Sequence, residues 1–362
     1  MVAISFWWLP LKKKIMETVE TEPIKTETKV EEESTAGRAW VKSGSEILAL
    51  RLRQVPTLVD PFVPKYGTMS LAGSSDLGKS YLLLQLSDAV INGATSFLGF
   101  TLNVTHKSVI YLSTEDDEYS LSPRLMNMAK NKTDLSGYEN LRVIFESNDL
   151  VRRLDTLLTE KPTDLVIIDT FSDIFDGDMN QANKVRSFIQ KFKELTVKHK
   201  TLIIFNHHCG KKNDYRPPHK DNLLGSQGFE SSMRTVIELR KDFSNPSHRH
   251  LCIVKGNYLS ESFKNSSFAL EFNFEDGFSN TGERLNFDRL VKSDERGAPA
   301  ARNAIKEKVV ILKAEGLSYG KIAAKLKAEG TPISKSTVGN ICKENRPAVQ
   351  FPMESESDGQ AA

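Results

Sequence analysis

The stretch Gly73-Ser74-Ser75-Asp76-Leu77-Gly78-Lys79-Ser80 fits the phosphate-binding pattern G-x-x-x-x-G-K-[ST] at every fixed position. Apolar residues 69–72 before it predict a strand, and residues 81–90 after it predict a helix. Glycines let backbone N–H groups turn toward phosphate oxygens, and the start of the helix adds its positive dipole end. We expect Lys79 to reach the β- and γ-phosphates of a nucleotide and the Ser80 hydroxyl to bind Mg²⁺. The predicted nucleotide-binding residues are Gly73, Ser74, Ser75, Asp76, Leu77, Gly78, Lys79, Ser80 and Tyr81.

The composition is that of an ordinary globular protein. Of 362 residues, 39% are hydrophobic and 27% are charged, with a net charge of +2. The three cysteines stand far apart and form no C-x-x-C pair, which argues against a disulfide framework and favours a reducing compartment. No apolar run approaches the roughly 20 residues that span a bilayer. We therefore expect a cytoplasmic protein.

Downstream of this stretch, strand-like and helix-like segments alternate. Apolar runs at 108–113, 141–145, 165–168 and 202–205 predict strands, and amphipathic segments at 119–128, 151–158 and 184–197 predict helices. This alternation is typical of an α/β domain with a mostly parallel sheet covered on both faces. Three later runs, at 235–239, 251–254 and 268–272, have no long helices between them and predict an antiparallel extension of the sheet.

Composition also divides the chain. Residues 1–38 begin with an apolar patch that precedes its lysines, unlike a secretory signal, and continue into a glutamate-rich stretch, so we expect a disordered extension in which Met16 is a candidate for the true start. We expect the nucleotide-binding domain over 39–275, a polar linker over 276–297, a small helical domain over 298–346, and a disordered tail over 347–362.

Two acidic residues are candidates for the chemistry. Leu165-Val166-Ile167-Ile168-Asp169 has the form of a Walker B strand, in which Asp169 would face the Mg²⁺ hydration shell. Glu115 follows the 108–113 strand, at the sheet edge where ligands of parallel sheets bind, and is a candidate to orient or deprotonate the attacking water. The alternative is that this acidic stretch caps the next helix, a role that suits Asp116 and Asp117.

The motifs GSSDLGKS, YLSTEDD, LVIIDT, IIFNHH and LLGSQGFESSMR, in this order, resemble the RepA-type branch of the RecA/DnaB-like ATPases, which are hexameric, DNA-linked motors of plasmids and other mobile elements. The resemblance covers roughly residues 55–275. It implies a RecA-like fold, hydrolysis of ATP with Mg²⁺, and a homo-oligomer, with Glu115 as the catalytic carboxylate. It also implies that the histidine ending the fourth core strand senses the γ-phosphate.

Two histidines compete for that sensing role. A neutral histidine at a strand end can donate a hydrogen bond to phosphate or water. A zinc pair is the alternative, but adjacent side chains on a strand point to opposite faces. We favour His208, with His207 second.

The resemblance further implies a basic residue supplied by a neighbouring subunit, and Lys255 stands at the matching place. The alternative is a solvated strand end. Gln227 departs from the family pattern, since relatives often carry Arg there, and Arg234 or Arg240 could compensate.

Two basic regions are candidates for DNA contact. Residues 210–225 carry Lys211, Lys212, Arg216 and Lys220 beside Tyr215, and in ring-shaped relatives this loop lines the central channel, where it would track single-stranded DNA. A solvated polar loop is the alternative.

The tail is the second basic region, with eleven Lys or Arg and four Glu between Arg296 and Arg346, a difference of +7. Its three predicted helices resemble a resolvase or transposase helix-turn-helix, which would read duplex DNA. The residues expected in the major groove are Lys335, Ser336, Thr337 and Asn340. A basic protein-binding module is the alternative.

The sequence thus predicts a RecA-like ATPase core followed by a helix-turn-helix, acting on DNA as a hexameric helicase or motor in replication, mobilisation or transposition of a mobile element. The alternative is a DNA-binding regulator or loader that uses ATP as an assembly switch without unwinding.

Overall fold

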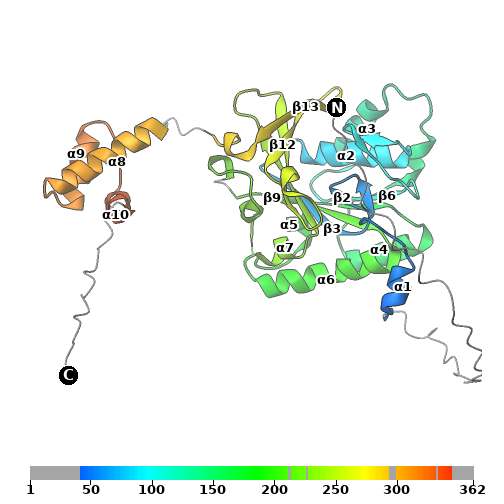
Figure 1. Ribbon diagram of the computed structural model, residues 1–362. Helices are drawn as coiled ribbons and strands as arrows, with labels where there is room; N and C mark the ends of the chain where they lie inside the picture. The colour runs from blue at the N-terminus through cyan, green and yellow to red at the C-terminus, as the bar shows by residue number, and fades with distance from the viewer. Residues whose placement is uncertain (1–40, 211–212, 226, 293–298, 332, 345–362) are drawn as a thin grey trace, which may run out of the picture. The chain divides into compact units, whose positions relative to one another are not determined.

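The computed structural model describes residues 41–210, 213–225, 227–292, 299–331 and 333–344. Its centre is a sheet of nine strands in the order β13-β12-β11-β10-β3-β9-β8-β6-β7 (Figure 1). From β10 to β7 neighbouring strands are parallel, and from β10 to β13 they are antiparallel. The predicted α/β fold with a mostly parallel sheet is confirmed. The strands are β3 (Gly67–Gly73), β6 (Val109–Ser113), β7 (Leu141–Ile144), β8 (Leu165–Asp169), β9 (Leu202–His208), β10 (Thr235–Lys241), β11 (His248–Gly256), β12 (Ser266–Asn273) and β13 (Gly277–Asn286).

Helices cover both faces of the parallel part of the sheet. Side chains alternate along each strand, so that Tyr111 packs in one hydrophobic core with α2 while its neighbour Ile110 packs in the other with α4 and α6. Because both faces are buried, the strands read in the sequence as continuous apolar runs. The helices are α2 (Lys79–Ile91), α3 (Glu118–Ala129), α4 (Leu150–Glu160), α5 (Phe171–Ile174), α6 (Ala182–His199) and α7 (Gln227–Ser231).

The remaining elements are short. Two antiparallel ribbons pair β1 (Thr57–Val59) with β2 (Val63–Pro64) and β4 (Ser96–Phe97) with β5 (Phe100–Thr101). Helix α1 (Gly44–Leu48) belongs to a separate unit and begins with a capping box between Ser43 and Glu46. Single 3₁₀ turns lie at η2 (Ser136–Asn140), η3 (Asn213–Tyr215), η4 (Lys220–Asn222), η5 (Glu261–Phe263) and η6 (Phe287–Arg289).

The predicted linker over 276–297 is wrong for its described part. Residues 277–286 form β13, which pairs with β12 along the edge of the sheet. Phe278 joins the main core, and Phe287 and Leu290 pack against Cys252. The segment looked like a linker because most side chains of β13 are exposed, as on an edge strand with one open face, so few apolar residues mark it. Ordered structure therefore continues past the predicted boundary at 275.

The C-terminal region contains the three predicted helices, α8 (Pro299–Ala314), α9 (Tyr319–Ala328) and α10 (Lys335–Glu344). They share a small core of their own, made by Val309, Leu312, Ile322, Leu326, Val338 and Ile341. The predicted disordered segments 1–38 and 347–362 lie outside the described residues. No helix in the described part of the chain is long and apolar enough to cross a membrane.

Candidate nucleotide site

The predicted phosphate loop joins the carboxyl end of β3 to the start of α2. Gly78 has φ +84° and Asp76 has φ +61°, so the backbone makes the tight left-handed turns that glycine permits at low cost. A Cβ atom on Gly78 would lie 3.0 Å from the ring of Phe278 and 3.2 Å from that of Phe272. Glycine is therefore required at 78 both for the backbone angle and for the close approach of these two rings.

Lys79 is folded back over this loop. Its Nζ donates a hydrogen bond to the Ser74 carbonyl at 2.7 Å, and the residue is only 6% exposed. Burial lowers the pKa of Lys79, while the nearby charges of Asp169 and Glu115 act in the opposite direction. The ammonium group thus lies near Asp169, which ends β8, and near Glu115, which follows the end of β6.

Asp169 ends β8 as predicted, and it is almost fully buried. The Tyr111 hydroxyl donates to Asp169 Oδ2 at 2.5 Å, and the Asn206 amide donates to Oδ1. Burial, together with the charge of Asp169, raises the pKa of Tyr111, so the phenol stays a donor. Neither partner was predicted from the sequence, since a tyrosine and an asparagine inside strands carry no local signal of a shared site.

The residues present fit a Mg²⁺ ion. Mg²⁺ usually keeps several water ligands and takes one or two carboxylates rather than a cage of protein ligands. The described residues contain no cluster of three or more His, Cys, Asp or Glu that could hold a metal. Binding of Mg²⁺ through one carboxylate and water molecules does not need such a cluster. Asn206 lines the cleft beside Asp169, and its buried Oδ1 has no protein partner, so it can accept from a metal-bound water. Ser80 lines the same cleft.

Glu115 and His208 meet across the site. His208 Nε2 lies 3.7 Å from Glu115 Oε1, and both side chains are partly exposed to the cleft. Of the acidic neighbours, Asp117 caps α3 by accepting from Ser120 N at 2.8 Å, and Asp116 is paired with Arg124 at 2.5 Å. Glu115 is therefore the carboxylate of this stretch that is engaged neither in a cap nor with an arginine.

His207 points to the opposite face of β9. It is fully buried, its ring stacks on Phe229 with centroids 4.2 Å apart, and its Nε2 donates to the Leu224 carbonyl at 2.8 Å. Burial lowers the pKa of His207 to about 4, so the ring is neutral near pH 7. The two histidines thus have different environments, and His208 is the one that lines the cleft.

The cleft has a volume of about 810 Å³ and a second wall made by residues far along the chain from the phosphate loop. This wall comes from the antiparallel edge of the sheet and consists of Pro246, Arg249, Phe272 and Phe274. The Arg249 guanidinium lies 5.8 Å from the Phe272 ring centroid and donates to the Pro246 carbonyl at 2.7 Å. These residues are far from the phosphate loop in sequence, so no local motif marked them.

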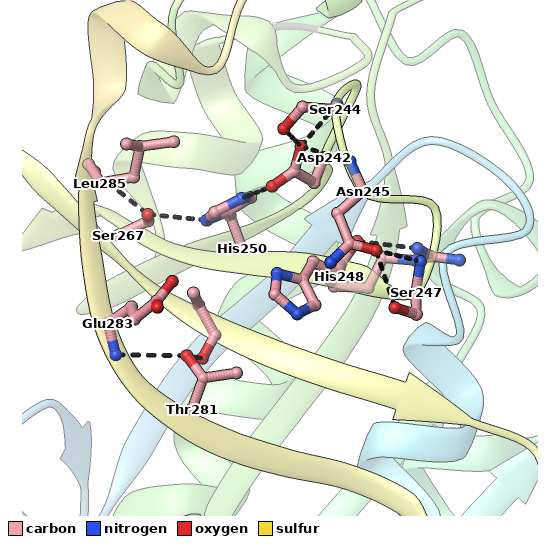
Figure 2. Close-up of polar contacts among 12 residues, drawn as sticks. Asp242, Ser244, Asn245, Ser247, His248, His250, Ser267, Thr281, Glu283 and Leu285 are labelled. Atoms are coloured by element: carbon pink, nitrogen blue, oxygen red, sulfur yellow. Dashed lines mark hydrogen bonds and ion pairs between the residues drawn. The ribbon is translucent and has the colours of Figure 1, made fainter.

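A polar network fixes the turn between β10 and β11, which contributes Pro246 to this wall (Figure 2). Asp242 Oδ1 accepts from Ser244 N at 2.7 Å and from Asn245 N at 3.0 Å, and Oδ2 lies 3.0 Å from His250 Nε2. His250 Nδ1 lies 3.0 Å from Ser267 Oγ. This Ser-His-Asp set is structural, because Ser267 is 0% exposed and no substrate can reach its hydroxyl.

Lys255 does not line the cleft. It pairs across the sheet with Val236, which is level with Ser70 in the middle of β3 rather than with the phosphate loop. Its Nζ lies 2.9 Å from the Glu230 carboxylate of the same chain. Of the two arginines that could compensate for Gln227, Arg240 is buried, whereas Arg234 is exposed.

The predicted DNA-binding residues are only partly described. Lys211 and Lys212 lie outside the described residues, while Arg216 and Tyr215 are exposed, with Lys292 Nζ 5.8 Å from the Tyr215 ring centroid. Helix α10 has an exposed face, whereas Val338 on the same helix is buried. That face carries Lys335, Ser336, Thr337 and Asn340.

Fold and site together define a P-loop ATPase domain. The chain belongs to the AAA domain family, whose model matches residues 32–214, half of the chain. It is 34% identical over 135 residues to the DNA repair protein RadA of Aquifex aeolicus (strain VF5), an alignment that covers 35% of this chain and 26% of RadA. The chain therefore spans about a quarter of the length of that relative. A solved ATPase domain is also similar, with a TM-score of 0.48 and 12% identity over 65% of this chain and 95% of that one.

Proposed function

We propose that this chain hydrolyses ATP with Mg²⁺ and uses the turnover to act on DNA, as a RepA-like hexameric helicase or motor of a mobile element. The observation that carries the proposal is the meeting of Lys79, Glu115 and His208 at one cleft, with a basic loop leaving β9 directly after His208. RadA, to which the chain is related, is a DNA repair protein by name, which supports a role on DNA.

In this proposal each group has one task. Lys79 and the backbone of the phosphate loop bind the β- and γ-phosphates, and Ser80 and Asp169 hold Mg²⁺, which would neutralise the charge of the phosphates. Glu115 accepts a proton from the attacking water, and His208 donates a hydrogen bond to the γ-phosphate or to that water. Lys255 of a neighbouring copy would stabilise the charge of the transferred group.

A second candidate is a DNA-binding regulator or loader that uses ATP as an assembly switch without unwinding. It is favoured by the ion pair between Lys255 and Glu230. In this pair Lys255 is bound by a carboxylate of its own chain and is not directed to a neighbouring copy. DNA would then be bound by the exposed face of α10 in a helix-turn-helix and not by a motor loop.

Steady-state ATP hydrolysis with and without single-stranded DNA, for wild type, Lys79→Ala and Glu115→Gln, separates the two. We expect DNA-stimulated turnover that both substitutions abolish. Nucleotide binding that depends on Lys79, with negligible turnover in every protein, would contradict the motor and support the switch.

A further inference from the structure

The loop between β9 and α7 rests on an ion pair that is buried beneath it. Glu238 and Arg240 lie on β10 and are 0% and 2% exposed, with Arg240 Nη1 3.3 Å from Glu238 Oε1. Burial raises the pKa of Glu238, and the charge of Arg240 opposes that rise. A buried pair is costly to desolvate and is retained only where further hydrogen bonds satisfy both groups. The partners of this pair are therefore informative.

Most of those partners belong to the loop. Glu238 accepts from Asn213 Nδ2 at 2.7 Å, from the His219 backbone N–H at 3.1 Å and from Asn222 Nδ2 at 3.2 Å. Arg240 donates to the carbonyl of Asn213 at 2.7 Å and to that of Arg216. Residues 213–222 are thus held by hydrogen bonds to two charged side chains of one strand.

The same strand touches the phosphate loop. A Cβ atom on Gly73 would lie 2.7 Å from the carbonyl oxygen of Leu239, the residue between Glu238 and Arg240. On the other side, Cys209 N donates to the Gly73 carbonyl at 3.3 Å, and Leu224 N donates to the His208 carbonyl at 2.9 Å. Gly73 therefore lies between the strand that holds the loop and the residue that begins it.

We propose that Glu238 and Arg240 are positioning residues that fix residues 213–222 relative to the phosphate loop, so that DNA bound by this loop changes ATP turnover. The connection runs from the loop through the buried pair and Leu239 to Gly73, and through Leu224 to His208. The proposal rests on the proposed function in one respect, namely that the loop contacts DNA. Neither residue lines the cleft, so neither is assigned a part in the chemistry.

The first test variant is Glu238→Gln, which keeps the side-chain shape and leaves Arg240 unpaired. The second is Asn222→Ala, which removes a loop-side partner and leaves the buried pair intact. Glu271→Gln, an exposed carboxylate on β12, is the matched control. The measurements on the full chain are ATP turnover with and without a mixed-sequence single-stranded oligonucleotide, and hydrogen exchange of the His219 amide, which is bonded to Glu238.

We expect basal turnover to stay near that of wild type in all three proteins. In the two test variants, the ratio of DNA-stimulated to basal turnover should fall by roughly tenfold, the scale of a coupling between two sites, while the His219 amide exchanges faster. Faster exchange with wild-type stimulation would overturn the proposal, since the loop would then be loosened without effect. The same conclusion follows if neither variant changes either measurement.

If Glu238→Gln does not fold, as judged by circular dichroism, Asn222→Ala decides alone. If DNA does not raise the ATP turnover of the wild-type protein, the proposed function itself is contradicted, and so is the proposed effect of loop-bound DNA on turnover. Normal stimulation of wild type and of both test variants would contradict only the role of the buried pair. The two failures are therefore distinguishable.

Discussion

His208 Nε2 lies 3.7 Å from Glu115 Oε1, although the strands that lead to these residues, β9 and β6, are separated in the sheet by β8. The intervening strand ends in Asp169, so three strand ends bring a histidine and two carboxylates to the same edge as the phosphate loop. This is the arrangement that parallel sheets offer to ligands, because the carboxyl ends of their strands share one edge.

Replacing Glu115 by Gln should lower ATP turnover by roughly 10²- to 10⁴-fold, the usual contribution of a general base. Nucleotide affinity should change little, because Lys79 and the phosphate-loop backbone remain. Turnover assays paired with equilibrium binding of a fluorescent ATP analogue check this. Glu118→Gln, an exposed carboxylate at the start of α3, is the control and should behave as wild type. Equal losses in both variants would remove Glu115 from the chemistry.

The buried His207 makes stability depend on pH. Its pKa is lowered from 6.5 to about 4. Between these two pH values the unfolded chain therefore binds a proton at His207 that the folded chain does not bind. Its contribution is therefore complete above pH 6.5 and is lost as the pH falls toward 4, by about 3 kcal/mol in the free energy of unfolding. Urea unfolding of wild type and His207→Gln at several pH values measures how the free energy of unfolding changes with pH. The two proteins should differ in this pH dependence between about pH 4 and pH 6.5. Equal pH dependence of the two proteins across this window would contradict the assignment to His207.

Comparing two glycines with similar backbone angles distinguishes the cost of backbone strain from the effect on the nucleotide site. Gly78 and Gly282 have φ +84° and +82°, but a Cβ atom meets aromatic rings only at Gly78 and nothing within 4 Å at Gly282. Both alanine variants should lose roughly 1–2 kcal/mol of stability from the left-handed angle. Gly78→Ala should lose more than that, and it alone should lose ATP affinity. Thermal unfolding and ATP titration measure these effects, and unchanged ATP binding by Gly78→Ala would contradict the assignment of this loop.

The proposed role of Lys255 in a neighbouring copy predicts complementation. Lys255→Ala and Glu115→Gln should each be nearly inactive alone, and an equimolar mixture should recover part of the turnover, because some interfaces combine an intact Glu115 with an intact Lys255. ATPase assays of the mixture against each protein alone provide the measurement. Lys264→Ala, which breaks a comparable ion pair with Glu261, is the control and should remain active. A mixture no more active than its parts would exclude the trans role.

The sequence by itself determined the phosphate loop, the parallel sheet and the residues that follow its strands. A glycine-rich turn, a buried apolar run and a carboxylate after a strand are local patterns. Each involves residues that are adjacent in the sequence, so it can be recognised without the structure. The strand runs at 108–113, 165–168 and 202–205 each correspond to an observed strand, and Gly78 and Lys79 stand where the motif requires them. The edge strand β13 was not predicted, because one of its faces is open to solvent and few apolar residues mark it.

Only the tertiary structure decided which polar groups work together. It showed that His208 lines the cleft while His207 is buried against Phe229, and it joined Tyr111 and Asn206 to Asp169. It also brought Arg249 and Phe272 to the far wall of the cleft and buried Glu238 with Arg240 beneath the basic loop. These contacts join residues distant along the chain, and burial and pairing depend on what surrounds a side chain in three dimensions. No short stretch of sequence carries that information.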